Sequence, residues 1–207
     1  MNAMEKNLKG LRAGLEDRSA ELAARVVDAA SARGLIDVAY SFVDSPFGHL
    51  LVAVTKRGLV MIEYPNHDFD RALEELTSKL SPRVLESPSS TDRIRRELEE
   101  YFSGTRRSFS VGVDLSLVHG FTRKVLDETA RIPFGKVSTY REVATRAGNP
   151  LAVRAAGNAL GSNPIPIVVP CHRVVRTGGG LGGYTGGLDR KVKLLELEGV
   201  DLPPAKR

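Results

Sequence analysis

Cysteine is almost absent from this sequence, because Cys171 is the single thiol in 207 residues. One cysteine excludes an internal disulfide and a zinc site built from several thiols. No apolar run approaches the roughly 20 residues that span a bilayer, and the N-terminus lacks the apolar core of a secretory signal. These absences predict a cytoplasmic protein that does not bind a membrane.

Positive charge is unevenly spread along the chain. Residues 116–207 carry 14 Lys and Arg against 7 Asp and Glu, whereas residues 1–115 carry 16 against 18. A basic C-terminal part favours a polyanionic partner. The alternative is scattered surface charge that serves only solubility.

The first half of the chain has the pattern of a helical extension followed by a small α/β domain. Leucine and valine at helical spacing predict a helix over 5–33, within an extension that covers 1–34. In the domain predicted over 35–115, alternating apolar residues and turn signals indicate strands, and longer periodic segments indicate helices. The expected strands are 37–43, 49–54, 59–64 and 108–115. The expected helices are 68–80 and 91–104, and residues 81–90 between them are expected to form a loop. Ser90 is the expected N-cap of the second helix, and Gly104 is expected to end it.

Residues 116–207 form the second predicted domain, which is mostly helical. One helix is stopped by Pro133, a second runs from a cap at Thr139 to Gly148, and a third ends at Gly161. The sequence AGNP joins the last two, with the length and turn residues of a helix-turn-helix. An ordinary pair of packed helices is the alternative.

Small residues recur along one side of the third of these helices. Ala152, Ala155, Ala156 and Ala159 follow helical spacing, and Arg154 is the only long side chain from 152 to 159. Such a face lets a helix approach another helix closely. It would also suit a narrow groove of nucleic acid, into which Arg154 would insert as a wedge.

Glycine dominates the segment TGGGLGGYTGG at 177–187. The match to G-x-G-x-x-G is weak, because the residues that follow leave no room for the second strand of a dinucleotide-binding unit. A flexible loop is the plain interpretation. The functional one is a loop whose backbone approaches a flat ligand, with Tyr184 and Thr185 beside it.

Cys171 precedes His172 at the end of a proline-rich apolar stretch. A reactive thiolate needs a base and a group that orients the base, and His172 and Glu198 are the candidates. Arg173 and Arg176 add positive charge that would favour the thiolate. Contact between adjacent side chains needs a tight turn or a bridging water. The alternative is a small buried cysteine beside a structural histidine.

The stretch IVVPCHRVV at 167–175 resembles the active-site signature of the O6-alkylguanine-DNA alkyltransferases, the methylated-DNA–protein-cysteine methyltransferases. The similarity continues in FGKVSTYREVA, in AVRAAGNALGSNPIP and in GGYTGGLDRKVKLLELEG, over roughly residues 35–200. The resemblance implies an N-terminal ribonuclease-H-like α/β domain. It also implies a mostly α, winged-helix-like C-terminal domain with a helix-turn-helix.

The resemblance implies a role for each matching residue. Cys171 would accept the alkyl group, His172 would act as its base through a water molecule, and Glu198 would orient His172. Asn163 would brace the turn before the active site, and Tyr140 would donate toward guanine N3. The implied contacts to substrate and DNA come from Arg154 in the gap left by a flipped base, Tyr184 in the pocket wall, the backbone near Val174 and Thr185 at the base edge, Lys191 in support, and Thr139, Ala152 and Ala155 near the DNA.

The implied function is DNA repair by a protein that acts once. An alkyl group would pass irreversibly from O6-alkylguanine, or from O4-alkylthymine, to Cys171 after base flipping in double-stranded DNA. Neither a metal nor an organic cofactor is needed, and we expect a monomer that can bind cooperatively along DNA. The alternatives are a non-catalytic DNA-binding damage sensor or regulator, and a thiol hydrolase. Two features depart from the family: residues 1–34 have no counterpart, and Thr185 stands where serine is common.

Overall fold

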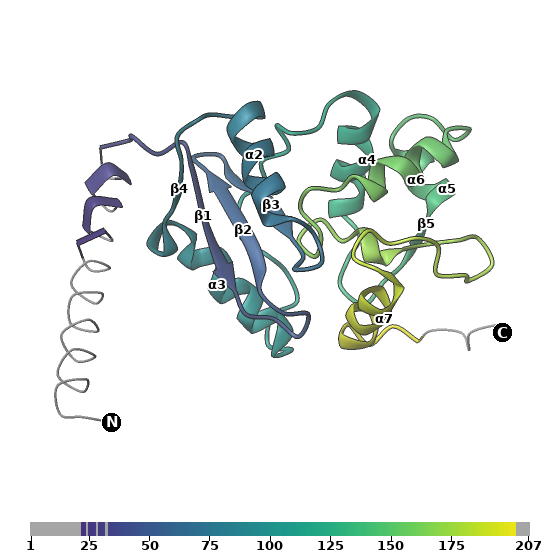
Figure 1. Cartoon of the computed structure of the whole chain (residues 1–207). Coiled ribbons are helices and arrows are strands. Elements are labelled where there is room, and N and C mark those ends of the chain that lie inside the picture. Colours follow the sequence, from purple (N-terminus) through teal and green to yellow (C-terminus); the bar gives the residue numbers. More distant parts are fainter. Residues whose placement is uncertain (1–21, 24, 28, 32, 202–207) are drawn as a thin grey trace.

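The computed structural model describes residues 22–23, 25–27, 29–31 and 33–201, so most of the helix predicted over 5–33 lies outside the described residues. Two parts lie side by side: a β-sheet with two helices, and a group of helices formed by the second half of the chain (Figure 1). No helix in the described part of the chain is long and apolar enough to cross a membrane.

A four-stranded sheet organises the N-terminal part. Its strands are β1 (Val38–Val43), β2 (Leu50–Thr55), β3 (Gly58–Glu63) and β4 (Val84–Glu86), in the spatial order β3-β2-β1-β4. The first three pair antiparallel in sequence order, and β4 adds in parallel to β1. The three strands predicted between 37 and 64 are therefore confirmed.

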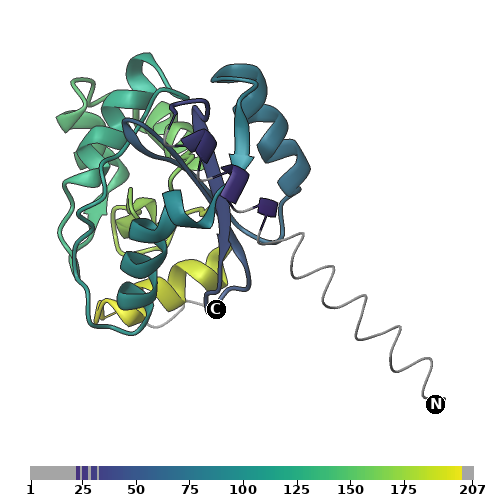
Figure 2. The ribbon, with the colours of Figure 1, turned by 90° about the vertical axis from the view of Figure 1, so that its left-hand side faces the viewer.

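Two helices cover opposite faces of this sheet (Figure 2). They are α2 (Phe69–Lys79) and α3 (Pro88–Phe102). The prediction of a loop over 81–90 with a cap at Ser90 is wrong, because β4 and the first turn of α3 occupy this stretch and the N-cap residue is Ser87. The physical reason is Pro88, whose fixed φ and missing N–H suit the first helical position. Gly104 follows the end of α3 with φ of 78°, as expected.

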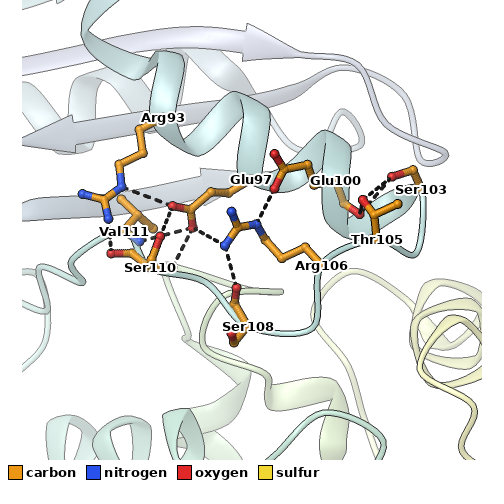
Figure 3. A network of polar contacts seen from close by, with 9 residues as sticks. All are labelled: Arg93, Glu97, Glu100, Ser103, Thr105, Arg106, Ser108, Ser110 and Val111. Atoms are coloured by element: carbon orange, nitrogen blue, oxygen red, sulfur yellow. Dashed lines mark hydrogen bonds and ion pairs between the residues drawn. The ribbon is translucent and has the colours of Figure 1, made fainter.

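Residues 108–115, which were predicted to form a strand, are instead bound to the buried carboxylate of Glu97. The backbone N–H groups of Ser110 and Val111 donate to Glu97 of α3, at 2.7 and 3.2 Å, and Arg93 donates to the carbonyl of Ser110 at 2.6 Å (Figure 3). These backbone groups are thus satisfied by side chains, and the stretch has no ladder beyond an isolated bridge between Val113 and Leu59. The strand prediction is wrong for that reason.

Four helices and a short parallel pair of strands form the C-terminal part. The helices are α4 (Gly120–Ala130), α5 (Tyr140–Arg146), α6 (Val153–Gly161) and α7 (Leu188–Leu197), and the strands are β5 (Ser138–Thr139) and β6 (Val174–Val175). Thr139 caps α5 in a capping box with Glu142. Gly148 follows α5 with φ of 92°, and Gly161 ends α6. These three boundary predictions are confirmed.

One of the two apolar cores in the described part of the chain runs through both parts, and the other lies between the sheet and α2. The shared core joins Leu50 of the sheet and Ile94 of α3 to Val125 of α4 and Leu194 of α7, all of them fully buried. The backbone N–H of Ile62 in β3 also donates to the carbonyl of Pro164 at 2.8 Å. The sheet therefore contacts the segment that leads to Cys171.

Replacing Glu97 with alanine tests the anchoring of residues 105–111 on α3. We expect Glu97→Ala to lower the free energy of unfolding by about 2–3 kcal/mol, because it removes the acceptor of several partly buried hydrogen bonds. Glu99→Ala is the matched control, since Glu99 is exposed on the same helix. Urea denaturation measures both. Equal losses in the two variants would contradict the anchoring role.

Candidate active site

The turn before Cys171 is fixed by Asn163. The Asn163 amide nitrogen donates to the carbonyl of Val169 at 2.8 Å and to the Cys171 sulfur at 3.2 Å, while its oxygen accepts from the N–H of Ile165 at 3.0 Å. Ile167, inside this turn, has φ of 75° and is fully buried. A β-branched residue in that region costs on the order of 1–3 kcal/mol, so the surrounding contacts must hold the turn in place.

Cys171 begins a turn of 3₁₀-helix that ends at Arg173. This tight turn brings three consecutive side chains into the buried interior: Cys171, His172 and Arg173 are 5, 0 and 7 % exposed. Cys171 and His172 form no direct hydrogen bond in the described part of the chain, where the sulfur has Asn163 as its side-chain partner. A relay between them would therefore need an intervening group.

Glu198, the C-cap of α7, is the centre of a buried polar network. Its carboxylate lies 2.9 Å from His172 Nε2 and accepts two hydrogen bonds from Arg173, each 2.8 Å long. Tyr101 of α3 donates its hydroxyl to the same carboxylate at 2.7 Å. Burial raises the pKa of Glu198, but the hydrogen bonds from His172 and Arg173 outweigh that effect and lower it to about 2. Glu198 is therefore ionised at neutral pH.

The protonation of His172 follows from this arrangement. Burial lowers the pKa of His172 more strongly than the contact with Glu198 raises it, so the imidazole is neutral. A carboxylate can only accept, which places the single ring hydrogen of His172 on Nε2. The Nδ1 atom then carries a lone pair, and it is buried without a hydrogen-bond partner among the residues that the structure describes. It is the free base of this site.

Cys171 is a protonated thiol in the resting protein. Burial raises its pKa to about 11, although Asn163 and Lys191 act in the opposite direction. The expectation that Arg173 and Arg176 favour the thiolate stays a prediction, because Asn163 and Lys191 are the side chains that lower the pKa of this thiol. The charge of Arg173 is neutralised by Glu198, and Arg176 is exposed. The thiol needs a base at the moment of reaction.

A pocket of about 700 Å³ opens beside the sulfur. Its lining includes five of the predicted site residues: Cys171, Tyr140, Arg154, Tyr184 and Thr185. Cys171 is buried, yet it borders this pocket, so its sulfur faces a cavity on one side. The volume and the aromatic lining suit a flat ring.

Lys191 holds the wall of the pocket from behind. Its ammonium group is fully buried and donates to the carbonyls of Val174, Leu181 and Gly183 at 2.6, 2.5 and 3.4 Å. Burial lowers the pKa of Lys191 to about 8. The carbonyl oxygen of Val174 is thus tied to Lys191, and the glycine-rich segment is tied to α7.

Glycine is required where the loop crosses Tyr140. Gly182 has φ of 72°, and a Cβ there would lie 2.5 Å from the Tyr140 hydroxyl oxygen. That hydroxyl donates to the carbonyl of Gly183 at 3.3 Å. Thr185 donates its hydroxyl to the carbonyl of Gly161 at 2.6 Å, so its side chain is already engaged with the end of α6.

The residues predicted to contact DNA from α6 differ in their exposure to solvent. Arg154 and Ala155 of α6 are exposed, whereas Ala152, the N-cap residue, is half-buried. The four alanines do not share one surface, because Ala156 and Ala159 are buried. Arg154 forms none of the hydrogen bonds or ion pairs found among the described residues. Its guanidinium is free to contact a ligand.

In comparisons with known proteins, both halves of the chain match domains of the same protein family. Residues 38–115 match the 6-O-methylguanine DNA methyltransferase ribonuclease-like domain, and residues 120–200 match the DNA binding domain of the same protein. The chain is 36 % identical over 166 residues to the methylated-DNA–protein-cysteine methyltransferase of Sulfolobus acidocaldarius, covering 80 % of this chain and 96 % of the relative. This chain belongs to the 6-O-methylguanine DNA methyltransferase family.

Other members of the 6-O-methylguanine DNA methyltransferase family agree with this assignment. The inducible methylated-DNA–protein-cysteine methyltransferase of Bacillus subtilis is 34 % identical, covering 71 % of this chain and 82 % of the relative. A crystal structure of Mycobacterium tuberculosis O6-methylguanine methyltransferase has a TM-score of 0.65 at 34 % identity, covering 81 and 96 % of the two chains. A crystal structure of Mycobacterium tuberculosis OGT in complex with DNA has a TM-score of 0.66 at 35 % sequence identity. The match covers 80 % of this chain and 96 % of that one. The chain therefore has the two-part fold of the family, with a ribonuclease-like and a DNA-binding domain.

Sequence reasoning missed one member of the site, Tyr101, and the partner of another, Arg173. Tyr101 lies 97 positions before Glu198, and nothing near it in the sequence signals that its hydroxyl reaches the carboxylate. Arg173 was visible beside His172, but its partner depends on where α7 ends. No group of three or more His, Cys, Asp or Glu in the described residues could hold a metal ion.

The charge of Glu198 generates a pH-dependent contribution to stability. Its pKa is about 2 in the folded protein against 4.5 for an ordinary glutamate, which corresponds to roughly 3 kcal/mol. A depressed pKa stabilises the fold above pH 4.5, and this contribution is lost as the pH falls toward 2. We therefore expect the stability difference between wild type and Glu198→Gln to be largest at neutral pH and to shrink below pH 4.5. Urea unfolding across pH measures it, and a difference independent of pH would contradict the ionised state.

Proposed function

We propose that this chain repairs DNA as a methylated-DNA–protein-cysteine methyltransferase, with Cys171 as the acceptor of the alkyl group. The observation that carries the proposal is the opening of Cys171 into an aromatic-lined pocket, with the unpartnered Nδ1 of His172 in the interior beside it. A single-use acceptor suits a thiol that stays protonated until substrate is present.

The reaction is a displacement at the alkyl carbon. The proton of Cys171 passes through a water molecule to His172 Nδ1, and the sulfur then forms a bond to the alkyl carbon as the bond from that carbon to guanine O6 breaks. Glu198 stabilises the imidazolium that results, because it already accepts from Nε2. Guanine leaves with the electron pair and takes up a proton. The thioether has no easy leaving route, so each molecule acts once.

Binding of the flipped nucleotide is assigned to the residues around the pocket. Tyr140 would donate to the ring nitrogen at guanine N3 in place of its 3.3 Å hydrogen bond to the Gly183 carbonyl, and Tyr184 would form the opposite wall. The backbone near Val174 and Thr185 would contact the base edge, with Lys191 holding that backbone. Asn163 would keep Cys171 directed at the pocket.

DNA binding is assigned to α5 and α6 as a helix-turn-helix within a winged-helix-like domain. The side chains of Ala152 and Ala155 are small, which would let the start of α6 approach the minor groove, and Thr139 would face the backbone at the start of α5. The wedge would be Arg154, which is exposed, unpaired and in the lining of the pocket. An alkylated base pairs weakly, which reduces the cost of flipping it, on the order of a few kcal/mol.

The substrate would be double-stranded DNA that contains O6-alkylguanine, and O4-alkylthymine is a second candidate. The predictions of a cytoplasmic monomer that binds DNA cooperatively remain predictions. The absence of any cofactor is also still a prediction.

Intact mass measurement tests the proposed reaction directly. After incubation with excess duplex DNA containing O6-methylguanine, the wild type should gain one methyl group per molecule, located on Cys171 by peptide mapping. Cys171→Ala should gain none, yet should still bind the DNA. A folded wild type that binds the lesion but keeps its mass would support the non-catalytic damage sensor instead.

Replacing Arg154 tests the wedge. Arg154→Ala should slow transfer from a duplex substrate by about tenfold or more, because nothing then fills the gap in the base stack. On single-stranded DNA carrying the same lesion the variant should approach the wild-type rate. The control is Arg71→Ala, which removes an exposed arginine from α2. An equal slowing of Arg154→Ala on both substrates would show that Arg154 acts after flipping.

A further inference from the structure

The N-terminal part of the chain reaches the wall of the pocket through Tyr64. This residue directly follows β3, and its hydroxyl oxygen lies 2.8 Å from the hydroxyl oxygen of Tyr184. The two rings meet edge to face, with centroids 6.3 Å apart at 69°. Tyr64 is 1 % exposed and lies behind the pocket, whereas Tyr184 belongs to its lining. Tyr64 therefore contacts the site without touching the space that a base would fill.

Tyr184 depends on such outside contacts because of the chain that carries it. Glycines flank it at 182–183 and 186–187, and a segment of that composition does not fix a ring by itself. The ring of His172 meets it at 90°, with centroids 6.5 Å apart. A Cβ on Gly186 would lie 2.8 Å from ring atoms of both tyrosines. Gly186 thus allows the two rings to approach each other.

Tyr64 is itself held firmly. The guanidinium of Arg190, from α7, lies 4.8 Å from the centroid of the Tyr64 ring. The same guanidinium donates to the side-chain oxygen of Asn66 at 2.6 Å and to the carbonyl of Gly186 at 2.5 Å. The ring of Phe47 packs against the edge of Tyr64. The hydroxyl of Tyr64 is therefore a fixed reference point for the hydroxyl of Tyr184.

Counting hydrogens gives the direction of the bond between the tyrosines. Burial raises the pKa of both phenols, so each carries its hydrogen, and the pair uses one of the two. Among the described residues, the hydroxyl group of Tyr64 has no hydrogen-bond partner other than the hydroxyl group of Tyr184. If Tyr184 were the donor, the hydrogen of Tyr64 would be buried without an acceptor, which is costly. The satisfied arrangement has Tyr64 donating to Tyr184.

We propose that Tyr64 is a positioning residue, which donates its hydroxyl to Tyr184 and so leaves the Tyr184 hydroxyl hydrogen for an oxygen or ring nitrogen of the base in the pocket. This inference rests on the proposed function. The ribonuclease-like domain then takes part in the reaction through a single hydroxyl. That hydroxyl acts only through Tyr184 and makes no contact with DNA itself, because Tyr64 is buried behind the pocket wall.

The test is a pair of isosteric substitutions measured by single-turnover transfer from duplex O6-methylguanine DNA. Tyr64→Phe should lower the rate at saturating DNA by about five- to tenfold, the effect of one lost hydrogen bond, with the half-saturating DNA concentration unchanged. Tyr40→Phe is the matched control, since it removes a half-buried tyrosine hydroxyl from the same domain far from the pocket, and it should keep the wild-type rate. Urea unfolding of each variant reports stability separately.

A double-mutant cycle separates positioning from packing. Tyr184→Phe should slow transfer by at least as much as Tyr64→Phe, and the double variant should be no slower than Tyr184→Phe alone. A wild-type rate in folded Tyr64→Phe, or additive losses in the double variant, would overturn the proposal. A wild-type rate in Tyr184→Phe would overturn it even if Tyr64→Phe did not fold. A wild type that transfers no alkyl group would instead reject the proposed function.

Discussion

The buried carboxylate of Glu198 is the constraint on which the rest of the site depends. It binds Tyr101 from α3, His172 and Arg173 from the turn at Cys171, and it ends α7. A buried anion with one cationic partner is stable only while every contact is kept, because loss of one partner leaves an unpaired charge in the interior. The same geometry that keeps Glu198 ionised fixes the hydrogen of His172 on Nε2. The free base at Nδ1 is thus a consequence of the charge balance around Glu198.

That balance explains why a thiol can be both reactive and protected. With a pKa of about 11, Cys171 is protonated at neutral pH, and oxidants and small electrophiles react with thiolates far more than with thiols. The neutral His172 supplies a base at the site without a permanent positive charge that would hold a thiolate. For a protein that can use its cysteine once, this arrangement keeps the acceptor intact until a base occupies the pocket.

Sequence analysis predicted those helix boundaries and strands that depend on local patterns. Its predictions were wrong or missing where the structure depends on residues far away in the sequence. Thr139, Gly148 and Gly161 carry their own helix signals, and the alternation of apolar residues in β1 to β3 needs no partner to be recognised. The stretch at 108–115 alternates as well, yet Glu97 takes the hydrogen bonds that a neighbouring strand would have taken. The contact of Tyr101 with Glu198 likewise depends on how α3 and α7 pack, which no short stretch of sequence contains.

The two domains are best understood as one scaffold for the turn at Cys171. The core is continuous between them, β3 donates a backbone hydrogen bond to Pro164 at the start of that turn, and Tyr101 and Tyr64 each place a hydroxyl on a site residue. The strained backbone at Ile167 needs support from every side, because a turn held only by its own residues would relax. The ribonuclease-like domain provides part of that support, through the hydrogen bond from β3 and its share of the common core. In the proposed reaction, the contribution of this domain is therefore geometric: it keeps the thiol, the base and the pocket wall in fixed positions, while the DNA binding domain contacts the DNA.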